Sequence, residues 1–505
     1  MCLWEEDPPE TATDILDFPR RGCKPLRLFE VAIVCLLLCC LMASWPSWRL
    51  AVPGRPVFAG WACFGLLALA LIAHLALEGA HWQMAPAYLS ILLIAPRMLS
   101  LRLSRGRWGM VSAISVVVLV VLTCGFSILL PVFSLSAPTG QYAIGTHILT
   151  LTDFSRKEDA EPGGRHFREL VVQIWYPALP SSNPRAPYRR RSETSLVSSY
   201  QSVDWTHARY DALVADEPGG FPILLYNPGW NGRRTQDTAL NEELASHGYV
   251  VVATDHPYNS GPVALADGRV IRPVPITAID DNVTSEDALY ALINREVEKE
   301  TTDALFVLAQ VERMNGEPAN AFYRHLDLSK VGAFGFSLGG MVATEVAYRN
   351  PGIGAAIAMD TPLYGEARLH GIKQPYMLLC EEITHSTPAE LARMSFGERR
   401  NTEMDEQDFD RQLPLFAKTG NYRIELRGSV HSSFLDIGLT SPLKSISEAG
   451  AIPARRMIEI LRAYTVAFFD QSLRGVPSPL LAAKSSPFPE AVVTSAVNNS
   501  GEKSP

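Results

Sequence analysis

Apolar stretches without a charged residue dominate the first quarter of the chain. The four stretches are Val31–Trp48, Val57–Leu77, Trp82–Ala95 and Gly109–Leu135. A helix needs about 20 apolar residues to cross a bilayer, and three of the stretches reach or approach that length. The pattern predicts an α-helical transmembrane region of three or four spans over residues 29–136, preceded by a polar tail at residues 1–28.

Basic residues crowd the segment just before the last apolar stretch, at Arg97, Arg102, Arg105 and Arg107. Arginine-rich loops stay on the cytoplasmic side of a membrane, which sets the direction of the span that follows. We therefore expect a multi-pass, membrane-embedded protein in which everything after Leu135 lies on the extracytoplasmic side.

Beyond residue 136 the apolar runs become short and alternate with amphipathic stretches. Strands are predicted at Tyr142–Leu151, Leu170–Tyr176, Phe221–Tyr226, Tyr249–Thr254, Val331–Phe336, Ile353–Met359, Tyr376–Cys380 and Tyr422–Leu426. Helices are predicted at Thr235–His247, 284–313, Leu338–Tyr348 and Ile452–Leu473. Strands that alternate with helices indicate an α/β domain, here residues 137–475, with a mostly parallel sheet and helices on both faces.

Three segments of this half stand out by their composition. Residues 180–192 are rich in Pro, Ser and Arg and are predicted to form an exposed loop. Residues 386–414 are polar and charged, show no strand signal and are expected to form a helical cap or lid near the site. Residues 476–505 are rich in Pro, Ser and Ala, and we expect a disordered tail.

Composition narrows the possible functions. The net charge is −8 and no basic tract is interleaved with aromatic residues, which argues against a nucleic-acid partner. Of the eight cysteines only Cys380 lies in the α/β part, so that part cannot form an internal disulfide. The histidines are scattered, without an H-E-x-x-H or C-x-x-C pattern, and we expect neither metal nor cofactor.

The pentapeptide Gly335-Phe336-Ser337-Leu338-Gly339 has the G-x-S-x-G pattern of a nucleophile elbow. The pattern alone is weak, but a predicted strand precedes it and a predicted helix follows, which is the order that an elbow requires. The helix N-terminus points amide donors toward an oxyanion. Ser337 is therefore the candidate nucleophile.

A serine hydroxyl needs a base, and the base needs an acid to orient it. His431 follows the last predicted strand, so it comes in the chain order serine, acid, histidine of α/β-hydrolases; His385 is the rival base. Asp360 follows the strand after the elbow and is the preferred acid. Glu381 and Glu382, which end the next strand, are the rival acids.

An oxyanion hole requires two backbone N–H donors. The first is expected from Leu338, the residue after the nucleophile. The second is expected from the loop that follows the Phe221–Tyr226 strand, where Trp230 comes after Gly229. The alternative is that this loop is a plain turn, since Asn-Pro and Asn-Gly pairs favour turns.

The soluble half resembles the platelet-activating factor acetylhydrolase family, that is, the plasma and intracellular type II enzymes and their microbial relatives. The resemblance covers residues 138–475 and is based on Pro222–Trp230, Leu244–Val251, Asp255–Ser260, Asp267–Arg269, Gly335–Gly340 and Gly428–Asp436. It implies an α/β-hydrolase fold and a calcium-independent serine esterase that releases short or oxidised acyl groups from phospholipids. In the family the acid follows the strand after the elbow, which favours Asp360. The chain has Asn227-Pro228-Gly229 where the family has Ser-His-Gly, and Phe336 where it has His.

We therefore expect a membrane-anchored carboxylic ester hydrolase that acts on a phospholipid or small-molecule ester. A dienelactone-hydrolase-like or polyester-cleaving enzyme without lipid preference is the alternative within the hydrolases. A non-catalytic membrane receptor or scaffold that kept the fold is the alternative from another class, and the complete set of Ser337, Asp360 and His431 argues against it.

Overall fold

The computed structural model describes residues 27–45, 55–99, 105–160, 164–274, 283, 285–383, 385–483 and 485–496. Contacts divide the chain into two compact units, Met1–Ser136 and Ala137–Pro505. Almost all of the predicted polar tail at residues 1–28 lies outside the described residues.

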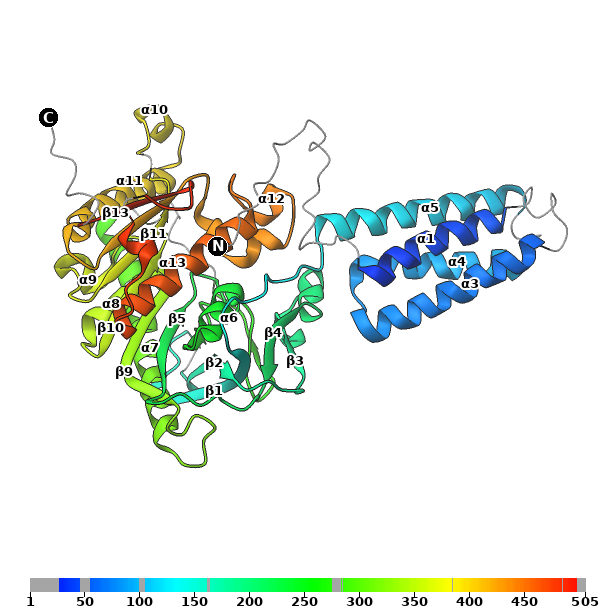
Figure 1. Ribbon diagram of the computed structural model, residues 1–505. Helices are drawn as coiled ribbons and strands as arrows, with labels where there is room; N and C mark the ends of the chain where they lie inside the picture. Colours follow the sequence, from blue (N-terminus) through cyan, green and yellow to red (C-terminus); the bar gives the residue numbers. More distant parts are fainter. Residues whose placement is uncertain are drawn as a thin grey trace, which may run out of the picture. The chain divides into compact units, whose positions relative to one another are not determined.

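The first unit is a bundle of helices (Figure 1). Its elements are α1 (Leu28–Ala43), α3 (Arg55–Ala73), a π-helical turn (His74–Glu78), a 3-10 turn (Trp82–Met84), α4 (Ala85–Leu99) and α5 (Gly106–Leu129). The helices pack through apolar side chains that include Ile33, Leu37, Ile94 and Val116. Arg97 is buried at the end of α4, where it donates hydrogen bonds to the carbonyl of Gly109 and to Ser44 Oγ.

Fewer helices of the described residues have the length and composition of a membrane span than the sequence predicts. Within the described residues two segments, Phe58–Glu78 and Gly106–Leu129, are long and apolar enough to cross a membrane by length and composition. Helix α1 has 16 residues and α4 has 15. Sixteen residues rise only roughly 24 Å, short of the ~30 Å hydrocarbon core. The expectation of three or four spans came from counting uncharged residues. Such a count overestimates the length of a helix that ends inside the uncharged run, and α1 ends at Ala43 whereas its run continues to Trp48.

The second unit is built on an 11-stranded sheet with the order β13-β12-β11-β10-β9-β5-β6-β2-β1-β4-β3, and β7 and β8 pair separately. Figure 1 labels most of the strands of the large sheet. The strands are β1 (Ala143–Lys157), β2 (Phe167–Ala178), β3 (Arg185–Pro187), β4 (Trp205–Tyr210), β5 (Phe221–Asn227), β6 (Val250–Asp255), β7 (Val263–Ala264), β8 (Val270–Ile271), β9 (Leu326–Phe336), β10 (Ile353–Met359), β11 (Tyr376–Glu381), β12 (Tyr422–Leu426) and β13 (Ala491–Ser495). Strands β5, β6, β9, β10, β11 and β12 run parallel to one another. At the two ends of this group, β2 pairs antiparallel with β6, and β13 pairs antiparallel with β12. The six parallel strands form the centre of the sheet.

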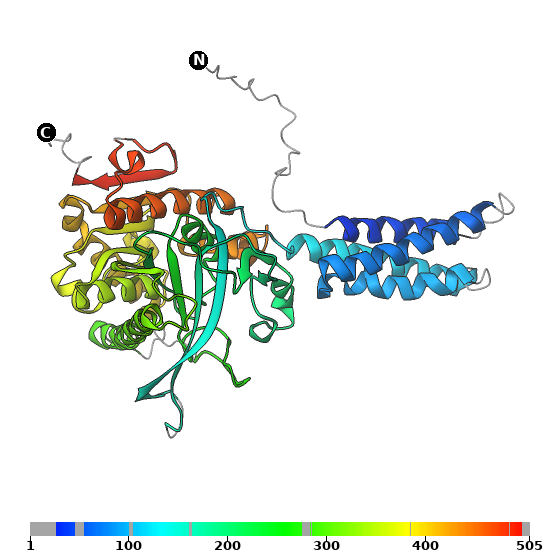
Figure 2. The same cartoon turned by 60° about the horizontal axis from the view of Figure 1, so that its bottom comes forward.

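Helices cover both faces of this sheet. They are α6 (Thr238–Ser246), α7 (Glu286–Gly316), α8 (Leu338–Arg349), α9 (Gly365–His370), α10 (Pro388–Leu391), α11 (Phe396–Arg411), α12 (Lys444–Ser447), α13 (Ala454–Arg474) and α14 (Pro479–Ala482). Successive residues of a strand point to opposite faces. Along β9, Ala333 therefore packs in the core that contains α7 and α8, and Phe334 in the core that contains α6 and α13. Figure 2 shows α13 (orange) and α7 (green) on opposite sides of the strands. The predicted α/β class is correct.

Two segments expected to be irregular contain strands. Within the loop predicted at residues 180–192, β3 pairs with β4. Within the tail predicted at residues 476–505, β13 pairs antiparallel with β12, from Tyr422 opposite Ser495 to Leu426 opposite Ala491. The expectation of a wholly disordered tail is therefore wrong. The composition of the segment does not reveal this strand, because its hydrogen-bond partners come from the edge of the sheet at β12. Residues 497–505 lie outside the described residues.

Candidate active site

Ser337 occupies the sharp turn between β9 and α8, where its backbone has φ 53° and ψ −125°. This positive φ strains any residue with a side chain, and such strain persists mainly where function requires the geometry. A Cβ on Gly335 would overlap the carbonyl group of Gly339, and one on Gly339 would overlap that of Asn227. The two glycines are therefore required by the close approach of the turn to the end of β5, as expected of an elbow.

The structure brings Ser337, His431 and Asp360 together. The Ser337 hydroxyl lies 3.1 Å from Nε2 of His431, and Nδ1 of His431 lies 2.6 Å from Oδ2 of Asp360. Asp360 is buried, whereas the His431 side chain is 53% exposed. With Nδ1–H donating to the carboxylate, Nε2 is free to accept the serine proton.

Sheet order explains why residues far apart in sequence meet here. Ser337 follows β9 and Asp360 follows the adjacent parallel strand β10, so both emerge at the same edge. The Ser337 amide donates to the Met359 carbonyl at 2.9 Å, and the Asp360 amide donates to the Leu379 carbonyl at 2.7 Å. His431 begins a 3-10 turn that follows β12.

The rival residues take other places. Glu381 is the last residue of β11, the strand next to the one that Asp360 follows. Its backbone amide donates a hydrogen bond to Asp360 Oδ1 at 2.8 Å, so Glu381 helps to hold that carboxylate. Glu382 is exposed. His385 is exposed and pairs with Asp410 at 3.0 Å. The geometry thus favours Asp360 and His431 over the three rivals.

Charges around the imidazole shift its titration. Although half of the His431 side chain is exposed, the protein packed around the rest of the ring lowers its pKa. The hydrogen bond and charge of Asp360, together with Glu381 and Asp405, outweigh this desolvation and leave the pKa of His431 above its ordinary value. Burial, followed by the charge of Asp360, raises the pKa of Glu381 to about 7. Burial, followed by the charge of Asp408, raises the pKa of Asp405 to about 7. A cationic His431 is therefore stabilised by this environment.

A cavity of about 230 Å³ opens at Ser337. Its walls are Trp230, Leu289, Ile293, Leu338, Met341, Tyr364, Asn401, Met404 and Asp405. Leu338 is the first residue of α8, and the first amides of a helix have no partner within the helix. Trp230 follows Gly229 in the loop after β5. Both residues expected to form the oxyanion hole therefore border the same space as the serine.

Phe336, noted in the sequence as a departure from the family pattern, packs its ring against the imidazole of His431, with centroids 4.5 Å apart. Several other site residues were missed from the sequence. Asn401, Met404 and Asp405 reach the cavity from α11, inside the segment whose charged composition suggested a cap. Leu289 and Ile293 of α7 had no signal, because their apolar spacing is that of any core helix. Tyr364, just before α9, had no signal either.

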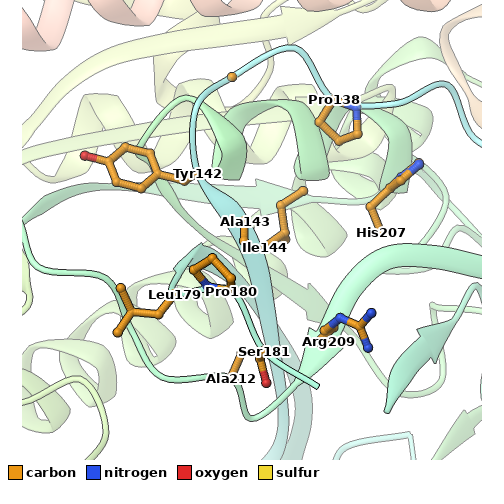
Figure 3. A pocket seen from close by; sticks show the side chains of 11 residues that line it. Pro138, Tyr142, Ala143, Ile144, Leu179, Pro180, Ser181, His207, Arg209 and Ala212 are labelled. Carbon is orange, nitrogen blue, oxygen red and sulfur yellow. The ribbon is translucent and has the colours of Figure 1, made fainter. Parts of the chain in front are cut away.

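A different cavity lies away from these residues. Its volume is about 380 Å³, and it is bordered by Tyr142, Ile144, His207 and Arg209 around strands β1 and β4 (Figure 3). It includes neither the serine nor its partners, although it is larger than the cavity at Ser337. Size alone therefore does not locate the chemistry.

Within the described part of the chain, the group of side chains placed to hold a metal ion is Glu30, His74 and Glu78, in the helical unit. Two of these side chains pair with each other, since His74 Nδ1 lies 2.9 Å from Glu78 Oε2. Glu30 forms an ion pair of 2.8 Å with Arg27. The groups near Ser337 are those of acid–base chemistry.

Residues 190–475 match the family model of platelet-activating factor acetylhydrolase, isoform II. The chain belongs to this family. A probable 1-alkyl-2-acetylglycerophosphocholine esterase of Arthroderma benhamiae is 24% identical over 71% of this chain and 93% of its own length. The platelet-activating factor acetylhydrolase of Cavia porcellus is 22% identical over 50% of this chain and 58% of its own.

A ferulic acid esterase from Streptomyces cinnamoneus has a similar structure, with a TM-score of 0.56 and 28% identity over 71% of this chain and 98% of its own. The family and this likeness agree with the α/β-hydrolase arrangement of the second unit. The protein is a serine hydrolase of carboxylic esters.

Proposed function

We propose that the protein is an esterase of the platelet-activating factor acetylhydrolase type that releases short acyl groups from lipid or phospholipid esters, with Ser337 as nucleophile. One observation carries this proposal: the Ser337 hydroxyl, the His431 imidazole and the Asp360 carboxylate form a hydrogen-bonded chain at the opening of a small cavity.

The geometry supports the following reaction. Ser337 Oγ attacks the acyl carbon while His431 Nε2 takes its proton, and Asp360 stabilises the imidazolium. The backbone N–H groups of Leu338 and Trp230 hold the oxyanion. His431 then protonates the leaving alcohol oxygen as its bond to the acyl carbon breaks. Water, deprotonated by His431, attacks the acyl-enzyme and releases the carboxylic acid and Ser337.

The cavity supports a short acyl group. Sites for drug-sized molecules typically measure about 300–1,000 Å³, and the cavity at Ser337 is about 230 Å³. Apolar walls from Ile293, Met341 and Met404 suit an acyl chain of a few carbons. The names of the curated relatives support an acetylated glycerophosphocholine as the ester.

The likeness to a ferulic acid esterase favours a second candidate, an esterase without lipid preference. This includes dienelactone-hydrolase-like and polyester-cleaving activities. A panel of short-acyl phosphatidylcholine analogues and p-nitrophenyl esters separates the candidates, because the second predicts faster turnover of the simple esters and no gain from a phospholipid head group.

We also propose that residues 29–136 anchor a catalytic domain of residues 137–475 in a membrane, on its extracytoplasmic side. Two helical segments have the length and composition to span, and large side chains such as Phe58, Leu69 and Val121 are exposed on their surfaces. A reporter fused after Pro138 should be active only outside the cytoplasm. Activity confined to the cytoplasm would reject this orientation.

Labelling with a fluorophosphonate probe tests the nucleophile. The full-length protein in detergent should be labelled once, at Ser337, and Ser337→Ala should lose both the label and hydrolysis of p-nitrophenyl acetate. Equal labelling of the variant would exclude Ser337 as the nucleophile. Ser329→Ala, at an exposed serine on β9, is a control that should keep both properties.

A further inference from the structure

Four ionisable side chains are buried together in the helical unit. Glu30 lies on α1, and His74 and Glu78 are the first and last residues of the π-helical turn that follows α3. His81 lies in the connection between this turn and α4. The four side chains are at most 11% exposed. Buried ionisable groups are costly unless they are paired or bind a metal, and π-helical turns are frequent at functional sites.

One atom of each side chain faces the others. His74 Nδ1 lies 2.9 Å from Glu78 Oε2, and His81 Nε2 lies 3.4 Å from Glu30 Oε1. The ligand atoms of Glu30, His74 and Glu78 all lie within 4.8 Å of one another, and the two imidazole rings have centroids 5.6 Å apart. The ligand atoms of a tetrahedral zinc ion lie roughly 3.4 Å apart, because zinc binds nitrogen and oxygen at about 2.1 Å. The four side chains therefore approach the spacing of a four-coordinate site.

The second oxygen of each carboxylate is held by the backbone. The Arg27 amide donates a hydrogen bond to Glu30 Oε2 at 2.9 Å, and the Phe29 amide donates one to Glu78 Oε1 at 3.2 Å. These bonds turn the other oxygens, Glu30 Oε1 and Glu78 Oε2, toward the histidines. Glu30 Oε1 also accepts a hydrogen bond from Arg27 Nε at 2.8 Å, and its second lone pair can still bind a metal. Two carboxylates beside one guanidinium leave a net negative charge, which favours a cation.

The second nitrogen of each imidazole also has a protein partner. His74 Nε2 lies 2.7 Å from the Tyr88 hydroxyl, and His81 Nδ1 lies 3.2 Å from the Gly79 carbonyl. A ring N–H that donates to such a partner leaves the lone pair on the other nitrogen, and partners of this kind orient the histidines of metal sites. The lone pairs of His74 Nδ1 and His81 Nε2 then face the two carboxylates.

His81 shows why a cation is needed in this arrangement. When its Nδ1–H donates to the Gly79 carbonyl, the lone pair of Nε2 lies 3.4 Å from Glu30 Oε1, and two acceptors repel each other unless a cation lies between them. A proton on Nε2 is the alternative to a metal ion. In that state Arg27 Nη2, 3.3 Å away, donates to Nδ1, and the four side chains form a metal-free hydrogen-bonded network.

We propose that Glu30, His74, Glu78 and His81 bind one divalent transition-metal ion, with zinc as the best match. Two imidazole nitrogens and two carboxylate oxygens suit zinc, and four protein ligands are typical of a structural site. The ion joins the start of α1 to the connection between α3 and α4. This departs from the expectation of no metal, which was based on contiguous motifs, because the ligands come from two separate segments.

Metal uptake by the full-length protein in detergent tests the site. After EDTA treatment and transfer to chelator-free buffer, wild type should bind one equivalent of Zn²⁺ more than Glu78→Gln, as measured by mass spectrometry of the metal. Zn²⁺ should also raise the thermal midpoint of wild type by several degrees and that of the variant by less, since a ligand of the folded state stabilises it. Co²⁺ should give the visible absorption of tetrahedral coordination in wild type and lose it in Glu78→Gln.

Glu366→Gln is the matched control, because Glu366 and His370 form another pair four residues apart, at 3.4 Å, with both side chains exposed. This variant should bind as much metal as wild type. Equal metal content and equal Co²⁺ spectra of wild type and Glu78→Gln would overturn the site, and so would a thermal midpoint of wild type that Zn²⁺ does not raise.

Tyr88→Phe tests the site without removing a ligand, and it serves where Glu78→Gln does not fold. Loss of the hydroxyl that orients His74 should weaken Zn²⁺ binding about 10–100-fold, the usual effect of losing such a partner. At saturating Zn²⁺ the variant should still bind one equivalent and give the tetrahedral Co²⁺ spectrum. Zn²⁺ affinity equal to that of wild type would show that His74 is not a ligand, and the metal-free network would then be the correct description.

Discussion

Phe336 packs its ring against the imidazole of His431, with the ring centroids 4.5 Å apart and the planes inclined by 39°. The same ring faces Phe434 at 6.5 Å. Phe336 directly precedes Ser337, so one strand end positions both the candidate nucleophile and one face of its base. The phenylalanine makes this wall of the site apolar.

Replacement of Phe336 by leucine should therefore reduce kcat on the order of tenfold, because an imidazole without its aromatic support samples orientations in which Nε2 does not face Ser337. Phe334→Leu is the matched control: Phe334 is buried two residues earlier on β9, against Tyr226 and Phe469. It should lower the thermal midpoint similarly and leave kcat unchanged. A similar loss of kcat in both variants would mean that general destabilisation is responsible.

The raised pKa of His431 predicts how activity depends on pH. The base must be neutral to accept a proton, so kcat/KM should fall as the pH decreases through a midpoint above about 6.5, the ordinary histidine value. Asp360→Asn removes the largest influence that raises this pKa, and burial then lowers it. The variant should lose on the order of 10³–10⁴ in kcat, and its remaining activity should have a lower pH midpoint.

Glu381→Gln is the comparison for this experiment, because Glu381 ends the next strand and its amide holds Asp360. Its side chain only adds to the charge near His431, so the variant should keep most of its kcat and move the midpoint downward slightly. A loss as large as that of Asp360→Asn would make Glu381 the acid.

Local spacing and chain order were enough to predict the elbow and the residues that meet around it. A side chain at Gly335 or Gly339 would clash with nearby backbone, so both positions require glycine and the G-x-S-x-G pattern is visible in the sequence. Asp360 was found because parallel neighbouring strands end at one edge. Their roles in catalysis stay predictions until they are tested.

Features that depend on distant partners could not be predicted. Polar residues surround Met404 in the sequence. Its side chain lines the cavity at Ser337 because α11 packs against α7, where Met404 contacts Leu289. The strand Ala491–Ser495 exists because β12 leaves an unpaired edge. The length of α1 depends on where its helix ends, which the run of uncharged residues up to Trp48 does not specify.

Asp436 should make stability depend on pH. Burial raises the pKa of this carboxyl to about 7, although it accepts hydrogen bonds from the Ala239 amide and the Tyr188 hydroxyl. The unfolded value is about 3.9. The protonated form is therefore favoured by folding, and this contribution is fully present below about pH 4 and is lost as the pH rises through about 7.

Asp436→Asn mimics the protonated carboxyl at every pH. The thermal midpoint of the variant relative to wild type should therefore be higher at pH 8 than at pH 5, as measured on the full-length protein in detergent. Asp267→Asn is the control, because hydrogen bonds from Arg269 lower the pKa of this exposed carboxyl and keep it ionised over that interval. If the thermal midpoint of Asp436→Asn differed from that of wild type by the same amount at pH 5 and pH 8, the raised pKa of Asp436 would be contradicted.

The elbow should not tolerate a methyl group at Gly339. A Cβ there would overlap the carbonyl of Asn227, which belongs to the backbone of β5 and cannot move aside. Gly339→Ala should therefore abolish fluorophosphonate labelling and lower the thermal midpoint by several degrees. Gly316→Ala is the matched control, since a Cβ at the end of α7 has no neighbour within 4 Å. That variant should be labelled like wild type, and normal labelling of Gly339→Ala would show that the turn has more room than these contacts allow.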